Sequence, residues 1–277
     1  MLPPANHYFR YQKHQFGERL TAEQKEQIEE AGFIHFKGFV DKQTVAALRE
    51  EVEEISDRLI AEGRTHIFGV PLIIGGHPGG KAFVQRLCFA SVMGERLHQF
   101  LQDPRFEEIC RFAGPGFRIG ERERDGLVVN HYRNQEGSVF KQQGWHTDSL
   151  RDVFYLEKPR RYLNVGFYLD DSPIEKGGLR FIPFSHRQSV WNLLARKKYY
   201  RDHTPDPAEI AVEAEAGDLT IHDGRAWHRA ARAEWTGEAS MRRVMYPPLM
   251  DGPLKRKDES SPTPFYHRLR RFAGFGR

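Results

Sequence analysis

Cysteine is scarce in this 277-residue sequence, which contains only Cys88 and Cys110. Two cysteines are too few for a disulfide framework or for a zinc site built from thiolates, and we expect both to be buried thiols. Long apolar runs are also lacking. No stretch approaches the ~18 consecutive apolar residues of a membrane-spanning helix, and the first residues hold no apolar segment typical of a signal peptide. These absences predict a cytoplasmic protein that does not enter the membrane.

A large excess of either charge is lacking as well, because 42 basic residues are offset by 38 acidic ones. The net charge of +4 and the pI near 9.0 would suit an anionic substrate or cosubstrate, or loose association with nucleic acid. Since most charges compensate one another, no partner follows from charge alone. With 39% hydrophobic and 12% aromatic residues, the composition is that of an ordinary globular protein.

The opening part of the chain is expected to be largely helical. Capping residues at Thr21 and Asp41 begin two helices, and a short strand is predicted between them over residues 34–40. A further helix is predicted over residues 86–112, where apolar side chains gather on one side. Residues 1–115 would therefore flank a sheet and cover its back.

From about residue 120 the apolar residues recur with the period of strands. Short strands between turn residues, with no helix long enough for a crossover, favour an antiparallel barrel or a double-sheet jelly roll. We predict one domain, mainly β with flanking helices, whose barrel core occupies residues 120–250 and is followed by a basic tail in residues 251–277. The strands are expected over residues 127–132, 161–169, 179–183, 210–214, 219–222 and 242–246.

Two stretches allow other interpretations. Residues 75–82 have the spacing of a phosphate-binding loop, but Ala82 stands where such a loop needs Ser or Thr, and Pro78 removes a backbone N–H. A flexible loop is favoured there. Residues 196–201 interleave basic and aromatic side chains, as nucleic-acid-binding segments do. An amphipathic helix with a solvated face, within residues 191–203, is the favoured interpretation.

A histidine and a carboxylate are separated by one residue at His146 and Asp148. On an extended strand these side chains project from the same face, so both could bind one metal ion. One more histidine would complete the facial triad of two histidines and one carboxylate that holds non-haem Fe(II) and leaves the opposite positions open. His222, on a predicted strand, and His228, after a turn, are the two candidates for it.

Three segments of the chain, taken in order, resemble motifs of the phytanoyl-CoA dioxygenase family. Residues 144–148 resemble the first metal motif of that family, residues 175–187 its turn and strand, and residues 217–228 its later strand pair. The likeness is distributed from about Leu20 to Tyr246. It implies a single dioxygenase domain, dependent on Fe(II) and 2-oxoglutarate, on a double-stranded β-helix, which is a cupin-like jelly-roll barrel.

The resemblance also assigns residues to the site. His146, Asp148 and His228 would bind the iron, which leaves His222 as a buried neighbour. The family places an arginine for the far carboxylate of 2-oxoglutarate on the strand after the distal histidine, where a planar guanidinium can pair with both oxygens.

That strand begins Arg242-Arg243. Adjacent residues face opposite ways, and the resemblance favours Arg242 over Arg243. Asn164 matches a polar position near the cosubstrate, and Asn130 and Tyr132 lie on the strand that enters the metal motif. Each of these three could instead be an ordinary hydrogen-bonding residue of its strand.

Asp148 bears on the type of reaction. In relatives that halogenate, a small residue replaces this carboxylate and opens a position for halide, so its presence favours hydroxylation. The expected reaction consumes O₂ and 2-oxoglutarate, hydroxylates an unactivated C–H bond of a small organic molecule, and releases succinate and CO₂. Desaturation, epoxidation and cyclisation can start from the same chemistry. A cupin-like protein that binds metal without oxygenase activity is the alternative, and neither nucleic acid nor a membrane is expected as a partner.

Overall fold

The structure is a computed structural model that describes residues 10–76, 80–148, 162–189, 191–192, 196–264 and 267. Its helices are α1 (Ala22–Ala31), α2 (Lys42–Ala61), α3 (Ala90–Met93), α4 (Glu95–Leu101) and α5 (Pro104–Ala113). Its strands are β1 (Lys13–His14), β2 (Phe33–Phe36), β3 (His66–Ile67), β4 (Val70–Pro71), β5 (Ile73–Gly75), β6 (Phe83–Leu87), β7 (Phe117–Ile119), β8 (Val128–Tyr132), β9 (Gln143–His146), β10 (Leu163–Tyr168), β11 (Gly178–Phe181), β12 (Ile210–Ala211), β13 (Leu219–Asp223), β14 (His228–Ala231), β15 (Arg242–Tyr246) and β16 (Leu249–Asp251). Short 3₁₀ turns lie at Ile174–Lys176, Ser185–Arg187 and Gly237–Ser240.

Two sheets form the barrel, and their strands pair antiparallel except for β1, which is parallel to β2. The larger has the order β1-β2-β13-β10-β15-β8-β6-β5 and the smaller β12-β11-β14-β9. From β8 to β15 the chain alternates between the two sheets, except that β11 and β12 are both in the smaller one. This alternation is that of a double-stranded β-helix, so the predicted jelly roll with flanking helices is confirmed. Two short ladders, β16 with β7 and β3 with β4, lie outside these sheets.

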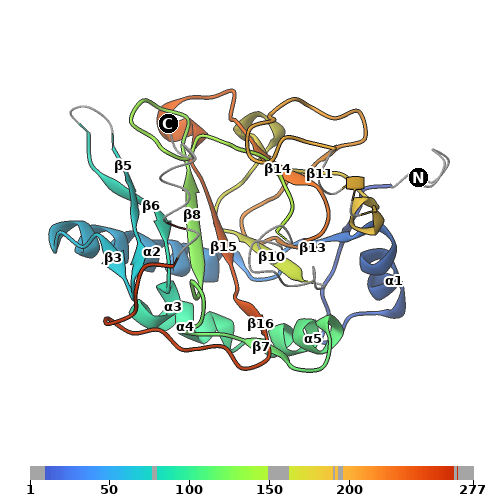
Figure 1. The fold of residues 1–277 in the computed structure, drawn as a ribbon, viewed down its shortest axis with the longest axis horizontal. Coiled ribbons are helices and arrows are strands. Elements are labelled where there is room, and N and C mark those ends of the chain that lie inside the picture. The colour runs from blue at the N-terminus through green and yellow to red at the C-terminus, as the bar shows by residue number, and fades with distance from the viewer. Residues whose placement is uncertain are drawn as a thin grey trace.

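The outer face of the larger sheet carries the main hydrophobic core. Side chains alternate between the faces of a strand, and every second residue of β10, from Leu163 to Phe167, is buried in a cluster with the apolar stripe of α2. In Figure 1 helices α3, α4 and α5 lie along the bottom of the view, below β8 and β15. Each fully buried aliphatic or aromatic side chain stabilises this arrangement by about 1.5–3 kcal/mol. The helices thus anchor the sheet from one side and leave its other face for the barrel.

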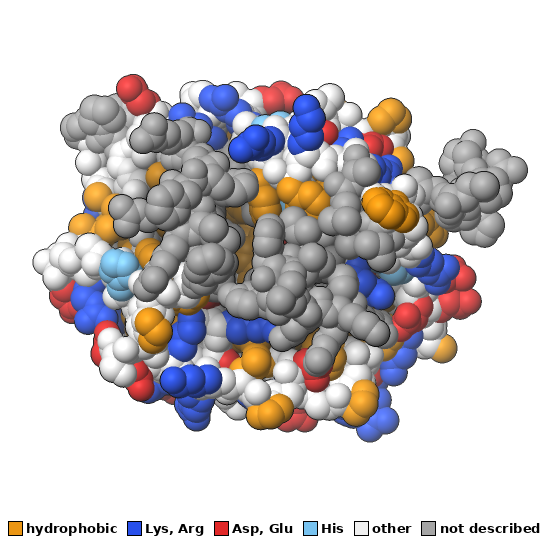
Figure 2. Space-filling view, in the orientation of Figure 1, with side chains coloured by type: hydrophobic (Ala, Val, Ile, Leu, Met, Phe, Trp, Pro, Cys, Tyr) orange, Lys and Arg blue, Asp and Glu red, His pale blue; other side chains and the backbone are white. Residues whose placement is uncertain are grey.

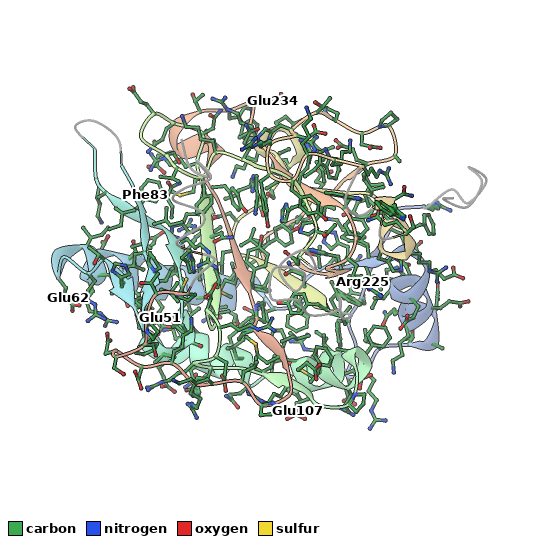
Figure 3. All side chains as sticks on the ribbon, in the orientation of Figure 1. Glu51, Glu62, Phe83, Glu107, Arg225 and Glu234 are labelled. Carbon is green, nitrogen blue, oxygen red and sulfur yellow. The ribbon has the colours of Figure 1, made fainter. Side chains whose placement is uncertain are left out.

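Capping interactions fix where the helices begin. Thr21 and Gln24 form the predicted capping box of α1, and Asp41 caps α2 by accepting from the Thr44 amide. The Glu51 carboxylate on α2 accepts the first backbone amides of α4, at Arg96 and Leu97. Figure 3 labels Glu51 at this junction. A carboxylate at a helix N-terminus satisfies amides that have no partner within the helix, so this contact orients α4 on α2.

Several local predictions are wrong. Residues 86–112 begin in β6 and then form three short helices, because Phe89 adopts a left-handed φ of 56° and Gly94 and Pro104 interrupt the helical run. The predicted strand over residues 34–40 ends at Phe36. Of the helix predicted within residues 191–203, residues 191–192 are helical, residues 193–195 lie outside the description, and residues 196–203 form bends and a turn instead.

Residues 75–82 connect two antiparallel strands, β5 and β6. A phosphate-binding loop instead requires a following helix, so the element after this stretch does not fit one. Residues 77–79 lie outside the description. The predicted start of a strand at Arg161 is also outside the described residues. The described part of the basic tail docks on the domain through an antiparallel bridge between Arg256 and Glu123, and residues 268–277 lie outside the description.

The surface mixes charges of both signs. Basic and acidic side chains are interspersed around the rim of the visible face in Figure 2. Arg196 and Lys197, from the stretch considered for nucleic acid, both pair with Asp206. None of the described helices is long and apolar enough to span a membrane.

Candidate metal centre and active site

Two histidines lie side by side on the paired strands β9 and β14 of the smaller sheet. His146 ends β9 and His228 begins β14, the two residues are directly paired in register, and their ring centroids are 4.1 Å apart. Each Nδ1 lies near the backbone carbonyl two residues earlier, Gly144 O at 2.8 Å and Ala226 O at 3.0 Å. An Nδ1–H that donates to a carbonyl fixes the neutral tautomer with its lone pair on Nε2. Both imidazoles are therefore oriented as metal ligands.

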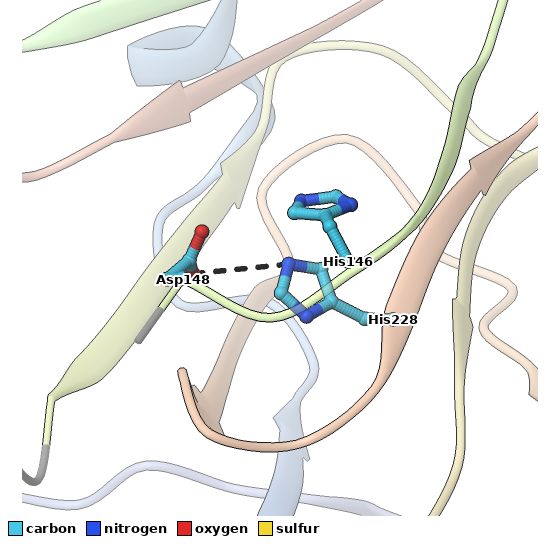
Figure 4. Close-up of side chains that lie close together, drawn as sticks. All are labelled: His146, Asp148 and His228. Carbon is cyan, nitrogen blue, oxygen red and sulfur yellow. Dashed lines mark ion pairs between the residues drawn. The ribbon is translucent and has the colours of Figure 1, made fainter. Parts of the chain in front are cut away.

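Asp148 completes the group from the turn after β9. Its backbone amide donates to Gly224 O at 2.7 Å, and Asn164 Nδ2 donates to its Oδ2 at 3.0 Å. His228 Nε2 lies 3.7 Å from the same oxygen, as the dashed line in Figure 4 marks. Burial opposes ionisation of Asp148, but the charge of the His228, His146 and His222 imidazoles when they are protonated, together with the hydrogen bond from the Asn164 amide, holds the pKa of its carboxyl below its usual range. Asp148 is therefore an anionic ligand at neutral pH.

The three side chains fit one metal ion. Their donor atoms all lie within 4.8 Å of one another. Nitrogen and oxygen ligands lie about 2 Å from a bound ion, so small side-chain rotations would bring the donors together around it. Two imidazoles and a carboxylate on one side of an ion make up the facial donor set that suits non-haem Fe(II).

A segment far along the chain covers β9, and the sequence did not reveal it. Tyr200 N donates to Trp145 O and Trp145 N donates to Asp202 O, both at 2.8 Å, so the segment runs beside the strand. The Tyr200 ring stacks on His146 with 4.9 Å between ring centroids. Gly144 permits this approach, because a Cβ there would lie 2.5 Å from Tyr200 O. We call residues 199–204 the β9 cover segment.

Gly224 has a similar role on the other side of the metal motif. A Cβ at this position would lie 3.2 Å from the Asp148 Cβ. Its carbonyl accepts from Asp148 N, and its own amide donates to Tyr162 O at 2.7 Å. The metal motif is thus held between two close backbone approaches, at Gly144 and Gly224.

The structure distinguishes the two adjacent arginines of β15. Arg243 faces outward, where its guanidinium pairs with Asp170 at 2.7 Å and with Glu53. Arg242 lies directly across from Tyr132 of β8 and is only 2% exposed. Its guanidinium donates to two backbone carbonyls, Lys176 O at 3.0 Å and Ala231 O at 2.9 Å, and lies 4.1 Å from the Tyr132 ring centroid. Among the described residues no carboxylate pairs with it.

Arg242 and the candidate metal ligands lie at opposite ends of β14. The strand runs from His228 to Ala231, whose carbonyl contacts Arg242. Three residues of extended chain span about 10 Å. This spacing suits a short dicarboxylate bound to a metal at one end and to a guanidinium at the other. Burial lowers the pKa of Arg242, because the charged guanidinium is removed from water. An anion bound beside it would stabilise this charge.

The other residues singled out from the sequence line the same interior. Asn164 holds Asp148, a contact that the sequence did not predict. Asn130 lies across from Val244 with its Oδ1 buried and without a hydrogen bond to the described residues. Tyr132 donates its hydroxyl to Gln143 Oε1 at 3.3 Å. His222 lies opposite Asn164 on β13, beside the candidate metal ligands.

The two tryptophans beside the metal motifs are fully buried packing residues. Trp145 donates its indole N–H to Thr204 O, and Trp227 donates to Gln188 Oε1. Trp227 also packs on Tyr199, whose hydroxyl is 2.9 Å from that of Thr147. These contacts fix the β9 cover segment against the loop that carries Asp148.

Comparison with known proteins identifies a family and related sequences. Residues 28–234 match the sequence profile of the family described as phytanoyl-CoA dioxygenase (PhyH). Ectoine dioxygenase of Bordetella parapertussis is 24% identical over 230 residues, which cover 78% of this chain and 68% of that protein. A phytanoyl-CoA dioxygenase domain-containing protein 1 homolog of Dictyostelium discoideum is 23% identical over 252 residues, covering 76% and 85% of the respective chains.

Solved structures share the fold. AviO1 from Streptomyces viridochromogenes aligns with a TM-score of 0.60 at 17% identity, over 85% of this chain and 97% of that one. The epimerase SnoN, solved with Fe³⁺, 2-oxoglutarate and nogalamycin RO, aligns with a TM-score of 0.55 at 20% identity, over 83% and 84%. At these identities the structural similarity shows the double-stranded β-helix alone.

Proposed function

The chain belongs to the phytanoyl-CoA dioxygenase family of 2-oxoglutarate-dependent non-haem iron enzymes, and we propose that it hydroxylates an unactivated C–H bond of a small organic molecule. Succinate and CO₂ would be the coproducts. The observation that carries this proposal is the compact group of His146, Asp148 and His228, in which a carboxylate occupies the third position. A carboxylate there leaves no position for halide, which favours hydroxylation over halogenation.

His146, Asp148 and His228 would hold the Fe(II). When bound, the iron together with 2-oxoglutarate and O₂ supplies the oxidising chemistry, and the protein contributes orientation and exclusion of water. The carbonyls of Gly144 and Ala226 keep both imidazoles turned with Nε2 toward the ion. Asn164 holds one oxygen of Asp148, so the direction of the carboxylate is set before metal binds.

Arg242 would bind the far carboxylate of 2-oxoglutarate. Its guanidinium is buried, lacks an anionic partner among the described residues, and is separated from His228 by the length of β14. Tyr132 supports the guanidinium through its ring face. Asn130 lies two residues before Tyr132 on the same inner face of β8. Its side-chain oxygen Oδ1 has no hydrogen-bond partner among the described residues and would face the chain of the cosubstrate.

The substrate is proposed as a small molecule because named relatives act on small molecules. One is an ectoine dioxygenase, and another was solved with nogalamycin RO. We propose neither nucleic acid nor a membrane as a partner, since the basic residues at 196 and 197 pair with Asp206. Cys88 and Cys110 are buried and form no disulfide, which suits the reducing cytoplasm that we propose as the location.

The direct test is anaerobic addition of Fe(II) and 2-oxoglutarate to the purified protein. A weak visible charge-transfer band should appear, and it should be absent in His146→Ala. Admission of O₂ should then release succinate. Candidate substrates, beginning with ectoine, should be screened for stimulated succinate release and for a product heavier by one oxygen. A wild-type protein that binds Fe(II) but gives neither band nor succinate would refute the proposal.

A further inference from the structure

One polar side chain beside the metal centre has no hydrogen-bond partner. His222 is 3% exposed, and neither Nδ1 nor Nε2 makes a hydrogen bond in the described part of the chain. A neutral imidazole has one donor and one acceptor, so both of its polar groups are unsatisfied. Buried polar atoms in folded proteins are nearly always hydrogen-bonded, and an exception of this kind calls for a partner that the protein chain itself does not supply.

In the described part of the chain, the buried imidazoles of His35, His131, His186 and His228 each have at least one hydrogen-bonded ring nitrogen. His35 bridges Tyr11 and Asp218 through its two ring nitrogens. His186 has its Nε2 at 3.0 Å from a backbone carbonyl, and His228 uses Nδ1 in the same way. His131 and His186 each leave one ring nitrogen unpaired among the described residues, whereas His222 leaves both. His222 differs from these histidines in its position, which is beside the candidate metal ligands.

His222 projects into the barrel next to the metal ligands. On β13 it stands directly opposite Asn164, the residue that holds Asp148. Its ring centroid is 4.6 Å from that of His228 and 5.7 Å from that of Phe181. It does not belong to the group of three whose donor atoms converge. The ring thus lies beside two residues that are paired across β11 and β14, His228 and Phe181.

We propose that His222 hydrogen-bonds to an oxygen atom of a non-protein ligand on the iron. The chemistry of that partner is an oxygen with lone pairs or a proton to share, and either a metal-bound water or the metal-proximal carboxylate of 2-oxoglutarate would provide it. The inference rests on the proposed function, because it requires iron between His146, Asp148 and His228. It adds a residue that would contact the ligand on the iron rather than the iron itself.

Three substitutions of His222 distinguish the contribution of each ring nitrogen from that of the flat ring itself. His222→Phe keeps a flat ring and removes both polar atoms. His222→Asn places its amide near the position of Nδ1, and His222→Gln reaches that of Nε2. The matched control is His131→Phe on β8: His131 is also buried with an unpaired Nε2, but it lies on the outer face of the same sheet, stacked on Phe83.

The measurements are the dissociation constants of Fe(II) alone and of 2-oxoglutarate in the presence of Fe(II), under anaerobic conditions, together with the melting temperature of the metal-free protein. We expect His222→Phe to weaken one of the two constants by about tenfold or more, the size expected for a hydrogen bond to a charged group. A loss for Fe(II) alone identifies water as the partner, and a loss confined to 2-oxoglutarate identifies the carboxylate. Either Asn or Gln should restore the affinity, which shows which nitrogen acts.

The metal-free melting temperature distinguishes this role from a structural one. His222→Phe should melt at the same temperature as the wild type or higher, because it removes two buried polar atoms that have no partner. The inference is overturned if His222→Phe binds both Fe(II) and 2-oxoglutarate within twofold of the wild type, if neither Asn nor Gln restores the affinity, or if His131→Phe weakens binding equally. A wild type that shows no charge-transfer band would instead count against the proposed function.

Discussion

Substitution of Arg242 by Met should abolish tight binding of 2-oxoglutarate while leaving the fold intact. The guanidinium is buried and, within the described part of the chain, donates to two backbone carbonyls, so these residues use two of its five N–H groups. A planar fork with N–H groups to spare can pair with both oxygens of a carboxylate. Met keeps a long apolar side chain in the same space.

The size of the effect follows from what the substitution leaves behind. Without Arg242 the carboxylate of the cosubstrate would be buried with no counter-charge. Removing one partner of a buried ion pair costs about 3–5 kcal/mol, which corresponds to a dissociation constant larger by about 10²- to 10³-fold or more. The dissociation constant of Arg242→Lys for 2-oxoglutarate should lie between those of the wild type and Arg242→Met. Lysine keeps the charge but loses the planar fork and its stacking on the Tyr132 ring.

The assay is an anaerobic titration of 2-oxoglutarate into the Fe(II)-loaded protein, followed by the charge-transfer band or by calorimetry. Arg243→Met is the matched control, since this neighbour on the same strand pairs with Asp170 on the opposite face. It should lower the melting temperature and leave the cosubstrate affinity unchanged. The reasoning fails if Arg242→Met binds 2-oxoglutarate within twofold of the wild type, or if Arg243→Met is the variant that loses it.

Three more predictions concern the frame around the site. Asn164→Ala removes the amide that holds Asp148 and should weaken Fe(II) binding about 10- to 100-fold in a chelator competition, without loss of secondary structure by circular dichroism. Gly144→Ala should destabilise the protein by about 1–3 kcal/mol in chemical denaturation, because its Cβ would collide with the β9 cover segment, whereas Gly17→Ala, with nothing closer than 3.9 Å, should not. Burial opposes ionisation of Asp218, but hydrogen bonds from an imidazole and two backbone amides outweigh it and lower its pKa from 3.8 to about 2. Its carboxylate should therefore contribute about 2 kcal/mol of stability above pH 4 that is lost as the pH falls toward 2, and Asp218→Asn should show a correspondingly flatter profile of denaturation midpoint against pH.

The parts of the fold that depend on side-chain period could be predicted from the sequence. Strands β8, β10, β13 and β15 each appear in the sequence as an alternating apolar run, and the structure places them side by side. The same alternation required that Arg242 and Arg243 face opposite ways. It also placed His146 and Asp148 together, because the spacing of one residue is a local property of an extended chain.

Contacts between distant segments could not be predicted in this way. The β9 cover segment pairs with a strand more than fifty residues away, and no local signal in Tyr199 or Tyr200 indicates that pairing. The interrupted helix over residues 86–112 is different, since Gly94 and Pro104 are signals that favour breaks and the apolar pattern concealed them. The unsatisfied state of His222 depends on what every neighbouring side chain already bonds to, which only the assembled structure shows.

In strands β10, β13 and β15 of the larger sheet, odd-numbered residues pack against the helices and even-numbered residues line the barrel interior. On β10 the odd-numbered residues pack against the helices, and the even-numbered residues, from Asn164 to Tyr168, face the barrel. The same parity holds on β13 and on β15, where Arg242 is even and Met245 is odd. In a saturation mutagenesis experiment scored separately for expression and for turnover, substitutions should therefore sort by residue parity on these strands. During evolution, substitutions at the even-numbered residues could change the substrate, while the odd-numbered residues continued to stabilise the fold.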